Sequence, residues 1–143
     1  MEQPLDHRLT ETTYQLGMLA DNRLLLSKNA LFPWFILVPS TQETEYHKLR
    51  NEQQTEIQQH INAIARFIEN NFSIDKINIA TIGNIVSQLH IHIIGRSRND
   101  ACWPDVVWGT AKFKAYQLQE VNTIKTELTS ALKETFQGSN KAG

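Results

Sequence analysis

The sequence predicts an α+β fold in which one long central helix and a C-terminal helix cover one face of an antiparallel sheet. Three observations lead to this prediction. Short apolar segments of strand length are separated by turn residues, which favours antiparallel pairing of neighbouring strands. A long stretch in the middle of the chain carries apolar residues at three- and four-residue steps, and a second such stretch lies near the end of the chain.

The first forty residues predict a hairpin. Residues 8–13 are polar and can form a helical turn, and residues 16–19 are a short apolar strand candidate. The pair Asp-Asn at 21–22 has turn chemistry, and residues 24–26 continue as a strand. Residues 34–38 are five apolar residues between two prolines, which is typical of a buried strand.

Residues 41–72 have the period of an amphipathic helix. Asn51 followed by Gln54 resembles a capping box, so the main helix is expected to begin near Asn51 after a shorter first turn. The Asn-Asn pair at 70–71 is expected to end it. The helix stripe consists of Tyr46, Leu49, Gln53, Ile57, Ile61, Ile64, Ile68 and Phe72.

Two further strand candidates follow the long helix. Residues 76–81 alternate polar and apolar side chains, as a half-buried strand does, and residues 86–96 alternate again after a Gly-Asn turn signal at 83–84. A loop at 99–109 and a last helix at about 118–137 complete the set, with Gly138 at the helix end.

The chain has no visible repeat or low-complexity block, so residues 1–143 are interpreted as a single domain. The motif-bearing core spans about 16–108, and residues 138–143 are expected to form a frayed tail. The longest apolar run, residues 30–39, is half the length that a bilayer span requires. The first eight residues carry no signal pattern, so we expect a soluble, cytoplasmic protein without membrane contact.

Charge and cysteine content exclude several classes of protein. The chain has 14 Lys+Arg and 15 Asp+Glu, for a formal net charge of −1. This balance excludes a polybasic protein that binds nucleic acid polymers, and a phosphate-bearing ligand must be held by local groups. The single cysteine, Cys102, excludes a disulfide framework and a multi-cysteine zinc site.

The most informative segment is 88–96, with the sequence Gln-Leu-His-Ile-His-Ile-Ile-Gly-Arg. Alternate side chains of a strand lie on one face, about 7 Å apart. One face is expected to carry a row suited to neighbouring groups of a polyphosphate: Gln88, His90, His92, Ile94 and Arg96. The other face is apolar enough to pack on the helix-covered core: Ser87, Leu89, Ile91, Ile93 and Gly95.

Three interpretations of this row are open on the residues alone. The first is a pair of polar side chains on a solvated sheet face. The second is a metal site, which needs further ligands, and no carboxylate or cysteine stands near with ligand spacing, so no metal is predicted. The third is covalent chemistry, in which one neutral imidazole attacks phosphorus while its neighbour handles charge or protons.

The pattern Gln88-x-His90-x-His92 resembles the histidine triad (HIT) motif His-x-His-x-His-x-x. The resemblance extends over about residues 16–108 and includes the hairpin, the long helix and the strand before the motif. The resemblance is strongest to a bacterial branch of the family that has glutamine in the first triad position. This branch also has a later Cys-Trp-Pro and a later Val-Trp-Gly, which stand here at 102–104 and 107–109.

This resemblance implies a hydrolase or transferase that acts on nucleotide α-phosphates, such as those of dinucleoside polyphosphates of the diadenosine tetraphosphate type or of nucleotide phosphoramidates. It also implies a homodimer and no cofactor. His90 takes the nucleophile's place, with its other ring nitrogen donating to a backbone carbonyl. His92 is expected to bond phosphate oxygens or the bridging atom. Gln88, the departure from the motif, keeps a donor and an acceptor but cannot titrate, which puts the rate and the leaving-group preference in doubt.

The resemblance also implies supporting residues. Asn29 aligns with a ribose-binding position, and Asn78 and Asn84 align with positions beside the phosphate pocket. Asn29 and Asn84 are equally typical of turns. Arg96 is expected either to reach a distal phosphate or to form a surface ion pair.

Other aromatic and histidine residues have simpler expectations. Trp103 and Trp108 are expected to stack on a base or, more readily, to anchor a subunit contact. The scattered histidines are expected at the surface: His7, His47 and His60. Three alternatives to the hydrolase stay open: a nucleotidyl transferase, a nucleotide-binding module with little turnover because of Gln88, and a structural interaction protein.

Overall fold

The computed structural model describes residues 3–139. The elements, in chain order, are α1 (His7–Thr12), β1 (Thr13–Leu19), β2 (Asn22–Ser27), β3 (Trp34–Val38), the short 3-10 helix η1 (Tyr46–Lys48), α2 (Asn51–Asn71), β4 (Lys76–Ala80), β5 (Ile91–Arg96), α3 (Leu118–Ala131) and β6 (Phe136–Gly138).

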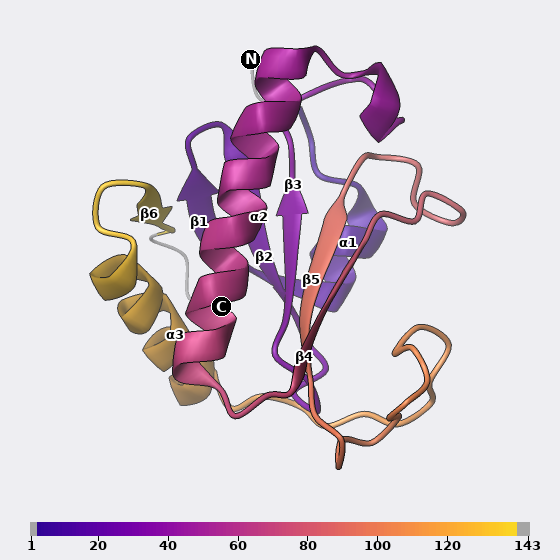
Figure 1. Cartoon of the computed structure of the whole chain (residues 1–143), viewed down its shortest axis with the longest axis vertical. Coiled ribbons are helices and arrows are strands. Elements are labelled where there is room, and N and C mark those ends of the chain that lie inside the picture. Colours follow the sequence, from indigo (N-terminus) through magenta and orange to yellow (C-terminus); the bar gives the residue numbers. More distant parts are fainter. Residues whose placement is uncertain (1–2, 140–143) are drawn as a thin grey trace.

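The strands of the described residues form one antiparallel sheet in the order β4-β5-β3-β2-β1-β6. Figure 1 shows α2 running across one face of this sheet with α3 beside it, while α1 lies behind the sheet. The predicted α+β class, with a long central helix and a C-terminal helix, is therefore confirmed.

The two faces of the sheet have different roles because neighbouring residues of a strand point to opposite sides. Ile91 and Ile93 of β5 belong to the main core, together with the buried residues of α2 and α3. On the opposite face, Leu9 of α1 packs against Ile36 of β3 and its neighbours. The expected core face of β5 is thus confirmed, and His92 is left to the α1 side.

Helix α2 begins and ends at the predicted residues, but the predicted capping box of Asn51 and Gln54 is wrong. The N-cap is Arg50, which makes no side-chain cap hydrogen bond. The Gln54 amide Nε2 instead donates to the carbonyls of Leu49 and Tyr46, at 2.9 and 3.3 Å. Gln54 therefore ties η1 to the first turn of α2.

The C-terminal helix is shorter than predicted, because α3 ends at Ala131 and Phe136–Gly138 pairs with β1. Gly138 is a strand residue rather than a helix end, and it faces Gly17 in the register. A Cβ atom at Gly17 would collide with the Gln137 carbonyl, so glycine is required for this close approach. Residues 140–143 of the expected tail lie outside the described residues.

The strand expected over 86–96 begins only at Ile91. The register agrees with this start, because the pairing with β3 ends at Leu37–Ile91 and the pairing with β4 ends at Ala80–His92. Residues 81–90 form the loop before β5. Among the described residues, no helix has the length and apolar character needed to cross a bilayer.

Candidate active site

His92 lies on β5, on the face of the sheet opposite to α2. It pairs across the sheet with Ile36, and its side chain is buried, at 6% exposure. The indole Nε1 of Trp34 donates a hydrogen bond to His92 Nδ1 at 2.9 Å. The rings of Trp34 and Trp108 lie 5.8 and 5.2 Å from the imidazole, centroid to centroid. His92 is therefore held between two tryptophans that are distant in the sequence.

His90 immediately precedes β5 and is also buried, at 5% exposure. Its Nδ1 lies 2.7 Å from the backbone carbonyl oxygen of Gln88. Because a carbonyl only accepts hydrogen bonds, Nδ1 carries a proton, and in the neutral imidazole Nε2 then holds the lone pair. This is the expected contact between His90 and a backbone carbonyl. The two imidazole centroids lie 5.0 Å apart.

The electrostatics of the pair follow from burial. Desolvation and, to a smaller extent, the neighbouring His90 lower the pKa of His92 to about 4. His92 is therefore neutral at neutral pH. Since its Nδ1 accepts the indole hydrogen bond, the ring proton of the neutral form sits on Nε2. His90 and His92 thus have opposite tautomers.

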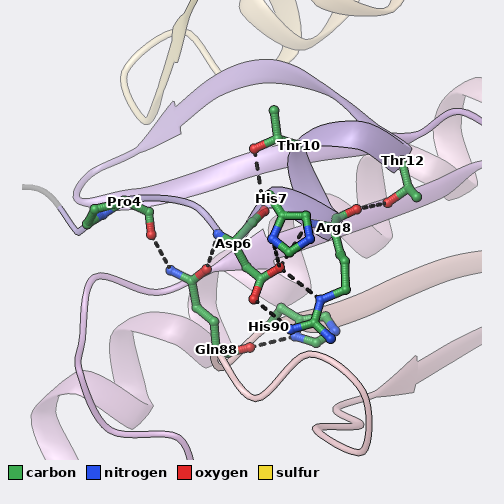
Figure 2. Close-up of polar contacts among 8 residues, drawn as sticks. All are labelled: Pro4, Asp6, His7, Arg8, Thr10, Thr12, Gln88 and His90. Atoms are coloured by element: carbon green, nitrogen blue, oxygen red, sulfur yellow. Dashed lines mark hydrogen bonds and ion pairs between the residues drawn. The ribbon is translucent and has the colours of Figure 1, made fainter.

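Gln88 does not join the histidines in a row, and the prediction of a single strand face is wrong at this residue. Its Oε1 accepts a hydrogen bond from the Asp6 backbone N–H at 2.7 Å, and its Nε2 donates to the Pro4 carbonyl at 3.1 Å. Figure 2 shows the Gln88 side chain directed to the N-terminal segment, while its carbonyl meets His90. Gln88 therefore links the N-terminal segment to the loop at 81–90, which ends at His90.

Arg96 is buried, at 2% exposure, so the expectation of a surface ion pair is wrong. Its Nε and Nη2 donate to the two carboxylate oxygens of Asp100 at 2.8 and 3.1 Å, and its Nη1 donates to Asn78 Oδ1 at 3.0 Å. Phe32 and Trp103 rings lie against the guanidinium. Arg96 and Asn78 are thus hydrogen-bonded to each other, and all three guanidinium nitrogens have protein partners.

Asp100 organises the loop after β5, although sequence reasoning missed it. Its carboxylate accepts backbone hydrogen bonds from Ser97, Cys102 and Trp103 as well as the Arg96 ion pair. Desolvation raises the pKa of Asp100, but the Arg96 and backbone hydrogen bonds together outweigh it and lower the pKa to about 2. The available signal was an acidic residue four positions after the arginine.

The remaining predicted residues lie apart from one another. Asn29 is buried, and its amide bonds backbone groups: Nδ2 donates to the Lys112 carbonyl at 3.1 Å, while Oδ1 accepts from the Leu31 and Lys114 N–H groups. Asn84 is exposed in the loop before β5. The amide of Asn29 therefore holds the 112–114 segment against the end of β2.

A pocket of about 400 Å³ lies beside the two tryptophans that contact His92, although neither His90 nor His92 lines it. It shares Trp34 and Trp108 with the surroundings of His92, and among the described residues the buried Nε1 of Trp108 has no hydrogen-bond partner. A larger hollow of about 560 Å³ lies near β6, but neither of the tryptophans that contact His92 lines it. The smaller pocket is lined by Glu11, Thr12, Ser27, Lys28, Asn29, Trp34, Val107, Trp108, Gly109, Thr110 and Phe113.

The other histidines differ from one another. His7 and His47 are exposed, as predicted. His60 is buried, at 6% exposure, and its Nδ1 lies 2.8 Å from the side-chain nitrogen of Asn22, so its surface placement is wrong. This contact ties α2 to the β1–β2 turn. Within residues 3–139, no group of three or more His, Cys, Asp or Glu is placed to hold a metal ion.

A small antiparallel α+β fold with two buried histidines at the start of a central strand is the arrangement of histidine triad proteins. Residues 14–99 match the HIT domain family, and the chain belongs to this family. Histidine triad proteins bind small nucleotide ligands, and typical members are nucleotide hydrolases or transferases. No curated protein gave a significant match.

Solved structures of three bacterial histidine triad proteins resemble the chain along nearly its whole length. The protein from Bradyrhizobium japonicum is 36% identical, with a TM-score of 0.86, and the match covers 92% of this chain and 98% of that one. The protein from Marinobacter aquaeolei is 33% identical, with a TM-score of 0.87 and coverage of 94% and 99%. The protein from Sinorhizobium meliloti is 32% identical, with a TM-score of 0.85 and coverage of 90% and 96%.

Proposed function

We propose that the protein is a nucleotide hydrolase that attacks the α-phosphate of dinucleoside polyphosphates or nucleotide phosphoramidates through His90. The observation that carries this proposal is the hydrogen bond between His90 Nδ1 and the Gln88 carbonyl. In the neutral imidazole this contact leaves the lone pair on Nε2, which is the atom that a nucleophilic attack requires.

In the first step, His90 Nε2 attacks phosphorus and a P–N bond forms. The bond to the leaving group breaks, and the leaving group departs with the bonding electron pair. In the second step, a water oxygen attacks the same phosphorus, the P–N bond breaks, and the nucleotide is released while the water proton passes to solvent. Both steps increase charge on the phosphoryl oxygens, so a nearby donor lowers the barrier.

His92 is the proposed donor for this charge, because its Nε2–H is free to point away from Trp34. The neighbouring pocket is the proposed nucleoside site. Trp34 and Trp108 offer aromatic surface to a base, and Lys28 and Thr110 line the same space with polar groups. The Trp108 Nε1–H, which has no partner among the described residues, is the proposed donor to a ligand acceptor.

Gln88 supports a second candidate, a binding module with little turnover. Its amide is occupied by Pro4 and Asp6, so it is not available to transfer protons. A nucleotidyl transferase is the third candidate, since an acceptor other than water can discharge the same intermediate. Product analysis separates the three.

The test is to incubate the protein separately with diadenosine tetraphosphate and with an adenosine phosphoramidate, and to measure AMP release and intact protein mass. We expect AMP release that falls by about 10³-fold or more in His90→Ala, because the nucleophile is lost. His47→Ala is the matched control, since His47 is exposed on η1.

Equal AMP release by His90→Ala and the unmodified protein would exclude His90 as the nucleophile. Tight nucleotide binding without AMP release would favour the binding module. Transfer of the nucleotide to an added acceptor in preference to water would favour the transferase. A protein that neither binds nor cleaves either compound would rule out all three nucleotide functions.

A further inference from the structure

Trp34 and His92 are joined by a side-chain hydrogen bond between two strands of the sheet. The two residues lie on neighbouring strands, β3 and β5, and the indole Nε1 is 2.9 Å from His92 Nδ1. An indole N–H is only a donor, so this hydrogen bond exists only while Nδ1 is unprotonated. A proton on Nδ1 would place two donors against each other in a buried site.

We propose that Trp34 is a positioning residue that holds His92 as a neutral donor with its proton on Nε2. This inference rests on the proposed function for its catalytic consequence, but the placement of the proton stands on geometry alone. The ring of Trp34 is itself fixed by edge contacts with Phe32 and Trp108, at centroid distances of 6.4 and 6.1 Å.

The consequence concerns the leaving group. A neutral imidazole can donate a hydrogen bond from Nε2, but giving up that proton would leave an imidazolate. His92 therefore stabilises charge on the phosphoryl oxygens or the bridging atom without protonating the leaving group. When the bond to phosphorus breaks, an oxygen leaving group departs with its electron pair as an anion, whereas the nitrogen of a phosphoramidate must take a proton from solvent. The rate should fall steeply as the leaving group becomes more basic.

The groups around His92 agree with this role. His90 stands two residues earlier and is itself neutral in the attacking form, and its presence disfavours a positive charge on His92. From the other elements, Trp34 and Trp108 present indole rings, which do not titrate. The titratable groups on the wall of the adjoining pocket are Glu11 of α1 and Lys28 after β2.

The direct test uses side-chain ¹⁵N NMR of the histidines in the intact protein without nucleotide. In the unmodified protein, we expect the His92 proton on Nε2 and the His90 proton on Nδ1. In Trp34→Phe, which keeps an aromatic ring but removes the N–H donor, the pKa of His92 should rise by about 1, the effect of one lost hydrogen bond to the neutral form. Some Nδ1-protonated form should also appear.

Trp108→Phe is the matched control, because it removes a second indole beside His92 that makes no hydrogen bond to it. The His92 proton should stay on Nε2 in this variant, with no Nδ1-protonated form. A proton on Nδ1 of His92 in the unmodified protein would overturn the proposal, and this measurement needs no variant to fold. Equal changes in Trp34→Phe and Trp108→Phe, or no change in either, would also overturn it.

Turnover tests the catalytic part. The substrates are aryl esters of AMP whose phenols differ in pKa, and kcat is measured for each ester in the series. The comparison is made at a pH below the raised His92 pKa of Trp34→Phe, where His92 of the variant is doubly protonated and can give up a proton. Under this condition, kcat of Trp34→Phe should fall less steeply with increasing phenol pKa than kcat of the unmodified protein. An unchanged slope with a raised His92 pKa would refute the leaving-group role. No turnover by the unmodified protein would instead refute the proposed function.

Discussion

At the scale of single residues, the two histidines show how identical side chains acquire different chemistry. His90 meets a carbonyl, which accepts, and His92 meets an indole N–H, which donates. Opposite partners select opposite tautomers, so one imidazole presents a lone pair and the other presents a proton. The proposed division into nucleophile and donor depends on these two contacts rather than on the histidines alone.

The buried pair Arg96–Asp100 supplies a prediction about stability. Asp100→Asn should lower the free energy of unfolding by about 3 kcal/mol, because it removes one partner of a buried ion pair and leaves the guanidinium charge uncompensated. The Asp100 side chain is 7% exposed, which limits screening by solvent. Urea unfolding of the variant at pH 7 measures the loss, and Asp105→Asn, in an exposed position of the same loop, is the control.

The pH dependence of the same pair has a definite sign. The folded pKa of Asp100, about 2, is below its ordinary value of 3.8. Its contribution to stability is therefore fully present above pH 4 and is lost as the pH falls from about 4 to about 2. The difference in unfolding free energy between the unmodified protein and Asp100→Asn should shrink over this range. A constant difference would mean that the ion pair does not stabilise the fold.

Sequence reasoning reached the triad residues because the motif places them two apart in an apolar segment. It missed the Trp34–His92 contact because the two residues are separated by 58 positions, and only strand pairing brings them together. It placed Arg96 near phosphate or at the surface because a single charge carries no information on burial. Asn78, 18 residues earlier, and Asp100 complete its surroundings only in the fold.

At the scale of elements, the loop before β5 explains why period-two alternation overestimated the strand. The predicted strand reaches back to Val86, but the last residue pairs in the register are Leu37 with Ile91 and Ala80 with His92. Without neighbours, residues 81–90 turn away. The consequence is that Gln88 faces the N-terminal segment, although its backbone still bonds His90.

This link predicts the behaviour of Gln88→Met. Methionine has a similar length but neither donates nor accepts the two strong hydrogen bonds, so the Asp6 N–H and the Pro4 carbonyl lose their partners. Amide hydrogen exchange at Asp6 should become about 10-fold faster, corresponding to the loss of roughly 1.4 kcal/mol. Gln58→Met, on the exposed side of α2, is the control.

Unchanged exchange at Asp6 would show that the apolar contacts of Leu5 and Leu9 hold the N-terminal segment without Gln88. The turnover of the same variant is informative as well. If Gln88 acts only through the N-terminal segment, then Gln88→Met should change AMP release less than His90→Ala does.

At the scale of the whole molecule, the two faces of the sheet carry different parts of the protein. The α2 side holds the main apolar core, and the opposite side holds the histidines, the tryptophans and the pocket. The polar site is therefore built from local groups, which agrees with a net charge of −1 over the chain. We propose that residues 1–143 act as one domain, since one sheet connects the walls of the site with the core.

The homodimer stays a prediction, and the open edge of the sheet is the proposed contact. β4 is an edge strand of the described sheet, and Ile79 on it is 52% exposed. An edge strand with an exposed apolar side chain is a template for pairing with a second copy. Ile79→Lys should weaken the dimer by about 10²-fold, because each copy would bury a charge in place of an apolar side chain.

Sedimentation velocity over a range of protein concentrations measures this change. Leu118→Lys is the matched control, because Leu118 is similarly exposed, at 50%, but lies on α3 and away from the β4 edge. A dimer that dissociates equally in both variants would contradict the proposal that β4 forms the contact. An unmodified protein that sediments as a monomer at the concentrations used for turnover would refute the homodimer, and the site would then have to function within one chain.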